Sequence, residues 1–125
     1  EQSFTINVND YPFDGAYVPR IVNSNPENTG YSDIDTALLL NGNQVVVWGS
    51  SNTTSGGKDV LAQLLDPTGK PIGNQINVFS ANQNNSGQIT DPSVTALQDG
   101  GFTIVFNERG VNTETGKSGS TIMVQ

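Results

Sequence analysis

The feature that most constrains how this chain can fold is an internal repeat. The segment from Asp33 to Trp48, DIDTALLLNGNQVVVW, is echoed by the segment from Asp91 to Phe106, DPSVTALQDGGFTIVF. In both copies an apolar run leads through an Asn-Gly or Asp-Gly turn into a β-branched run that ends in an aromatic residue. The turn glycines, Gly42 and Gly100, stand 58 residues apart. Self-similarity at such a period is typical of proteins built from stacked supersecondary units.

Two shorter matches extend the repeat to four strands per unit. The tripeptide Ile6-Asn7-Val8 recurs as Ile76-Asn77-Val78, and residues 60–63 match residues 122–125. We therefore expect an all-β chain of two repeated four-stranded antiparallel units, about residues 1–65 and 66–125. Each unit is expected to begin with its Ile-Asn-Val strand. Its second and third strands are expected to form a tight hairpin, because Asn-Gly and Asp-Gly adopt the positive φ values of two-residue turns.

The packing of the two units has two interpretations. Four antiparallel strands in roughly 40–50 residues are typical of a β-propeller blade, but a propeller ring needs about 4–8 blades. A sandwich-like pair of sheets is therefore favoured, while a slice of a longer array or an assembly of several copies stays open. The run from Val45 to Trp48 is apolar on both faces, which suits a strand between packed layers. Trp48 and Phe106 are interpreted as core residues.

The ends of the chain are offset by one strand. Phe4, Ile6 and Val8 alternate with polar residues, the pattern of a strand buried on one face. The second unit ends at Gln125 without an Ile-Asn-Val strand of its own, so we expect the N-terminal strand to complete it. Pairing within one chain would close the domain, and pairing between chains would give a fibre by strand addition.

Composition excludes several functions. Twelve acidic residues against five basic ones give a net charge of −7, which argues against nucleic acid and anionic membranes as partners. The chain has no Cys and no His, so Cys/His zinc sites and Ser-His-Asp or Cys-His catalysis are impossible. We expect no enzymatic activity. A glycosidase that uses Asp33 and Asp35 is an alternative, but it would also need a deep sugar cleft.

The only cofactor that the sequence suggests is calcium. Glu27, Asn28, Asp33 and Asp35 fall in one loop-to-strand segment and offer the oxygen ligands that calcium prefers. Residues i and i+2 of a regular strand share a face, so both aspartates could reach one cation. The alternative is an ordinary solvated strand entrance with turn-capping aspartates.

One loop contains a cluster of aromatic residues. Tyr11, Phe13 and Tyr17 could stack on a sugar ring while Asp14 and its neighbour Asp10 accept hydroxyl hydrogen bonds. The alternative is a loop folded over the sheet edge with its aromatic side chains in the core. This cluster is the basis of an alternative function, a lectin-like carbohydrate-binding module that is assisted by calcium.

The repeat motif also resembles a known class of sequence. The pattern Asp-Pro-Ser-Val-x-Ala-Leu-x-Asp-Gly-Gly-Phe-x-Ile-Val-Phe, followed by Ile-Asn-Val strands, is similar to tandem repeats of large bacterial secreted and cell-surface proteins of the RTX-adhesin type. The resemblance covers about residues 33–106 and the chain ends. It implies an extracellular, non-enzymatic structural or adhesion module, whose partners are other copies, neighbouring repeats or glycans. The chain lacks the glycine-rich RTX nonapeptide, so the resemblance does not extend to the calcium-binding roll.

Overall fold

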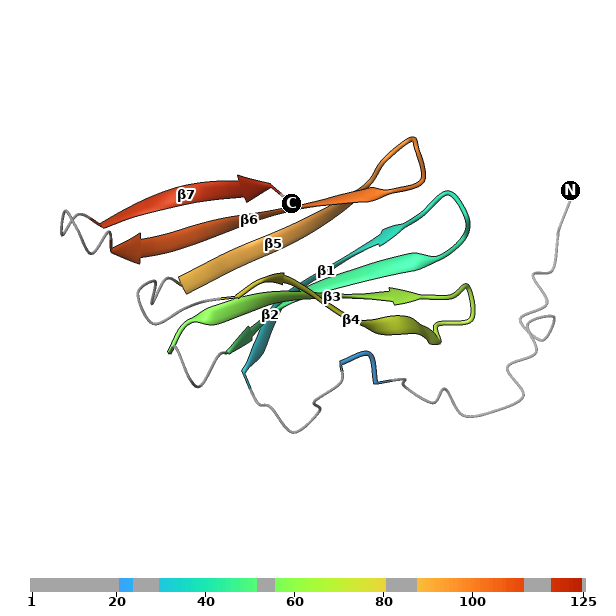
Figure 1. Cartoon of the computed structure of the whole chain (residues 1–125), viewed down its shortest axis with the longest axis horizontal. Helices are drawn as coiled ribbons and strands as arrows, with labels where there is room; N and C mark the ends of the chain where they lie inside the picture. Colours follow the sequence, from blue (N-terminus) through green and yellow to red (C-terminus); the bar gives the residue numbers. More distant parts are fainter. Residues whose placement is uncertain (1–20, 24–29, 52–55, 81–87, 112–117, 125) are drawn as a thin grey trace, which may run out of the picture.

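The computed structural model describes residues 21–23, 30–51, 56–80, 88–111 and 118–124. These residues form seven strands and no helix, which confirms the predicted all-β class (Figure 1). The strands are β1 (Tyr31–Leu38), β2 (Gln44–Ser51), β3 (Lys58–Leu65), β4 (Pro71–Phe79), β5 (Gln88–Ala96), β6 (Phe102–Val111) and β7 (Ser118–Val124).

The strands form two antiparallel sheets. The first sheet has the order β1-β2-β3-β4, and the second has the order β5-β6-β7. The Ile76-Asn77-Val78 segment lies in β4 and pairs with β3, so it is the last strand of the first sheet and does not begin the second one. The expected strand order is corrected accordingly, and the division between the sheets falls between Phe79 and Gln88, whereas the repeat boundary was expected near residue 65. Among the described residues the second sheet contains three strands, so a pair of four-stranded units is not what these residues form.

The first three strands of each sheet repeat with the same register. Val47 lies opposite Ala62, and its repeat equivalent Val105 lies opposite Val124. Trp48 and Phe106 likewise lie opposite Leu61 and Met123. This agreement places β7 in the position that β3 occupies in the first sheet.

A β-bulge is also repeated. The register of β1 with β2 shifts between Ser32 and Asp35, and that of β5 with β6 shifts between Thr90 and Ser93. Within each bulge an aspartate has a positive φ, 53° at Asp33 and 56° at Asp91. Aspartate tolerates this left-handed conformation better than most residues, because its short polar side chain bonds locally.

The hairpins lie where the sequence predicts them, but their turn type differs. Leu39 N donates to Asn43 O and Gly42 N donates to Leu39 O, and the same pair of bonds recurs 58 residues later. Gly42 and Gly100 have positive φ, whereas Asn41 and Asp99 do not. The loops therefore have three residues and end in a left-handed glycine. Within each loop the Asn or Asp side chain accepts a hydrogen bond from the amide two residues on.

The two sheets pack through faces that are not equivalent in the repeat. The first sheet contributes Val45, Val47, Val60 and Ala62 to the buried core, and the second contributes Val94, Ile104 and Phe106. In repeat terms Ile104 and Phe106 correspond to Val46 and Trp48, which lie on the opposite face of their strand from Val45 and Val47. The sheets are thus stacked head to tail, as successive units of an array, and do not present equal faces to each other.

The contact between the sheets is closest at β5. This strand lies against β1, β2 and β3, and β1 and β5 run in the same direction (Figure 1). Farther across the interface, between β4 and β6, the rings of Phe79 and Phe106 meet with centroids 5.4 Å apart. Small residues therefore suit the contact beside β1, where Ala37 lies, and aromatic rings fill the interface at β4.

Candidate functional site

The bulge on β1 places the Asp35 carboxylate at the junction of the two sheets. Its Oδ2 accepts hydrogen bonds from Ser93 Oγ (2.8 Å) and Val94 N (2.9 Å) on β5. Its Oδ1 accepts one from the Thr36 amide (2.8 Å). The Val94 amide, followed by the Ser93 hydroxyl and the Thr36 amide, lowers the pKa of Asp35. Asp35 and Ser93 are the same position of the repeat, so this bond joins equivalent points of successive units.

Asp33 has different partners. Its Oδ2 lies 3.5 Å from Lys58 Nζ and accepts a hydrogen bond from Ser32 Oγ, and Lys58 Nζ also donates to Ser32 Oγ. The strand entrance is therefore an exposed polar cluster that connects β1 to β3. These contacts hold the bulged end of the first sheet.

These contacts bear on the predicted calcium ligands. The bulge interrupts the regular alternation on which the shared face of Asp33 and Asp35 depended, and each carboxylate has its own protein partners. The described part of the chain contains no group of three or more acidic residues placed to hold a metal ion. Glu27 and Asn28 lie outside the described residues, so the four-residue calcium site stays a prediction.

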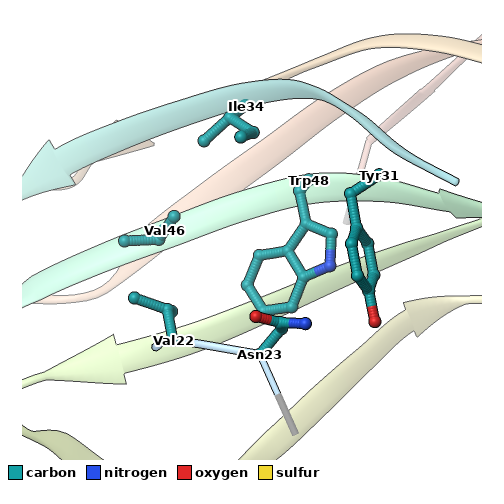
Figure 2. A pocket seen from close by; sticks show the side chains of 6 residues that line it. All are labelled: Val22, Asn23, Tyr31, Ile34, Val46 and Trp48. Atoms are coloured by element: carbon teal, nitrogen blue, oxygen red, sulfur yellow. The ribbon is translucent and has the colours of Figure 1, made fainter. Parts of the chain in front are cut away.

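A second feature lies on the other face of the first sheet. An open pocket of about 230 Å³ is lined by Val22, Asn23, Tyr31, Ile34, Val46 and Trp48 (Figure 2). Tyr31 and Ile34 come from β1, and Val46 and Trp48 come from β2. The walls are almost entirely apolar. Such a site can bind an apolar surface but offers no carboxylate for acid–base chemistry.

Trp48 supplies the one unsatisfied polar group of this pocket. The residue is 4% exposed, and its indole Nε1 is buried without a hydrogen-bond partner. A buried donor without an acceptor costs about 1–3 kcal/mol, so this N–H favours a partner that brings an acceptor. Trp48 is buried, as the sequence predicts, but it lies outside the core between the sheets, whereas Phe106 lies within it.

This pocket is not among the sites predicted from the sequence. The pattern that indicates it is the run of four apolar residues in β2. Side chains of a strand alternate between faces, so Val45 and Val47 lie on one face and Val46 and Trp48 form a second apolar face. The predicted sugar-binding residues Tyr11, Phe13, Asp14 and Tyr17 lie outside the described residues. The predicted assembly strand, with Phe4, Ile6 and Val8, lies outside them as well.

Comparisons with known proteins give no relative: no family model, no curated protein and no solved structure matches the chain. In the part of the chain that the structure describes, no helix is long and apolar enough to cross a membrane.

Proposed function

We propose that this chain is a non-enzymatic extracellular structural or adhesion module that assembles with further copies by β-strand complementation. The bacterial surface proteins that its repeats resemble support the extracellular assignment. The observation that carries the proposal is the difference between the sheets: β3 pairs with a fourth strand, whereas its equivalent β7 is the outermost described strand of the second sheet.

The sequence contains a second copy of that fourth strand. In β4, Ile76 lies opposite Ala62 and Asn77 lies opposite Leu61. Ile6-Asn7-Val8 repeats the Ile76-Asn77-Val78 segment. Strand addition at an open sheet edge supplies main-chain hydrogen bonds, and side chains on alternate positions supply specificity. The proposed donor strand therefore sets Ile6 opposite Val124 and Asn7 opposite Met123 of a neighbouring copy.

The test is the assembly state of the purified full-length chain, measured by negative-stain electron microscopy and sedimentation velocity. The wild-type chain is expected to form fibres, and a chain without residues 1–9 is expected to lose them. A wild-type chain that stays monomeric at every concentration, or a deletion mutant that assembles fully, would overturn the proposal.

A proline variant separates strand pairing from other effects of the N-terminal segment. Asn7→Pro removes an amide donor and is incompatible with a central strand, so it should abolish fibres. Asn7→Ala keeps the amide and serves as the matched control. A synthetic peptide of residues 1–9 is expected to cap the growing ends and shorten the fibres, whereas the same peptide with Asn7→Pro should have no effect.

A further inference from the structure

The outer face of the first sheet, defined as the face of Ile34, Val46 and Trp48, is apolar and partly open. Ile34 is 71% exposed and Leu38, two residues beyond Thr36 on the same strand, is 66% exposed. Ile34 lines the pocket that contains the unpaired Trp48 N–H. Exposed apolar surface next to an unsatisfied donor indicates a binding surface.

The repeat shows what covers this kind of face. In the second sheet the equivalent positions are Pro92, Ile104 and Phe106, and all three are buried; Ile104 and Phe106 pack in one core with Val45 and Val47 of the first sheet. We call the face of Val46 and Trp48, and its repeat equivalent, the Trp48-type face, and the face of Val45 and Val47, with its equivalent, the Val47-type face. Each chain therefore already contains one contact between a Trp48-type face and a Val47-type face.

The second sheet has its own copy of the Val47-type face, and no other described strand packs on it. Thr95 lies opposite Thr103 on the outer face of the second sheet, and Val105 lies on the same side of β6 as Thr103. These residues correspond to Ala37, Val45 and Val47 of the first sheet. Threonine has nearly the shape of valine and adds a hydroxyl group, so this face keeps a β-branched surface and remains compatible with water.

We propose that the outer face of the second sheet of one chain stacks on the outer face of the first sheet of a second copy. The contact repeats the packing between the two sheets of one chain, with Ile34, Val46 and Trp48 in the places of Pro92, Ile104 and Phe106. Because the two surfaces that meet are different parts of the chain, the contact is head to tail and propagates from copy to copy. It uses the sheet faces and not the β7 edge, so the face contact and the strand exchange can fail independently.

The internal junction identifies which residues meet. Within one chain Asp35 lies against Val94. Moving each residue to its equivalent in the repeat places Ser93 of one copy beside Thr36 of the next. The chain has no cysteine, so single cysteines at these two positions give an unambiguous crosslink.

The experiment mixes a full-length Thr36→Cys chain with a full-length Ser93→Cys chain under mild oxidation. A disulfide-linked dimer is expected from the mixture, at least tenfold above either chain alone. A crosslink formed by Thr36→Cys alone would indicate a symmetric contact, and a mixture without crosslink would exclude stacking; both results overturn the proposal.

Two further variants test the surface. Ile34→Lys on the Thr36→Cys chain puts a charge on the apolar face and should reduce the crosslink at least tenfold, and Ile34 is exposed enough for the fold to tolerate it. Ile72→Lys on the same chain is the matched control, because Ile72 is an exposed isoleucine of β4 that pairs with Leu64 on the Val45 face, and it should leave the crosslink unchanged. Asn7→Pro should also leave it unchanged, which separates this contact from strand exchange. A crosslink insensitive to Ile34→Lys would contradict the proposed surface.

Discussion

At the scale of single residues, Asp35 is the side chain that joins the two repeats. It accepts two hydrogen bonds from β5, and the alignment of the repeats makes Ser93 its own equivalent. The sequence shows that Asp35 and Ser93 correspond, but it does not show that they touch. The prediction that Asp35 and Asp33 bind one cation together assumed a regular strand. The bulge at Asp33 removes that regularity. A positive φ at aspartate is too weakly encoded to be predicted from one copy.

Replacement of Asp35 tests this connection. Asp35→Ala is expected to lower the free energy of unfolding by about 1 kcal/mol at pH 7, a value reduced from that of a buried charged hydrogen bond because the carboxylate is largely solvated. The measurement is urea unfolding monitored by circular dichroism. Ser93→Ala should cost less, since the Val94 amide bond remains.

The effect of Asp35 should depend on pH. The pKa of the folded carboxyl is lowered, chiefly by the Val94 amide, so its contribution is present above the unfolded pKa of about 3.9. The contribution is lost as pH falls through the lower folded pKa. The stability difference between wild type and Asp35→Ala should thus be constant from about pH 7 to 5 and shrink below about pH 4. A difference that persists unchanged to pH 2 would contradict this assignment.

At the scale of elements, the hairpins show how far local sequence determines structure. The positions of both the Asn-Gly and the Asp-Gly turn could be predicted from the sequence, because glycine at positive φ is needed whichever turn type forms. The turn type was not readable. The turn type depends on the register of the two paired strands, which end at the loop-closing hydrogen bonds of Leu39 and Leu97. Pairing across the sheet sets this register.

Gly100 provides the test at this scale. Gly100 has φ +91° with open space around it, so an added Cβ meets no atom and the cost of Gly100→Ala is backbone strain alone. We expect a loss of about 1 kcal/mol in the free energy of unfolding. Gly119 also has open space but no positive φ, so Gly119→Ala is the matched control and should be neutral or slightly stabilising. Equal effects of the two substitutions would exclude the strain explanation.

At the scale of the whole molecule, the repeat predicted the strands but not how the sheets meet. Periodicity identifies which residues are apolar, yet Val45 to Trp48 is apolar on both faces and leaves the choice of partner open. The second copy settles which face is buried within one chain: where the first sheet has Val45 the second has Thr103, so the more apolar face of the second sheet, with Ile104 and Phe106, packs against the first. The difference between the copies, and not their likeness, sets the direction of stacking.

Head-to-tail packing makes the two sheets one cooperative unit, and the single tryptophan reports on it. Trp48 belongs to the first sheet and Phe106 to the second, where its ring meets Phe79 of the first sheet. Phe106→Ala is expected to cost about 3 kcal/mol, a large share of the stability of a small domain. Because the core is shared, Trp48 fluorescence and far-ultraviolet circular dichroism should report the same shifted midpoint in urea. If the sheets were independent, the fluorescence transition of the first sheet would stay at its wild-type midpoint while the dichroism transition separated into two.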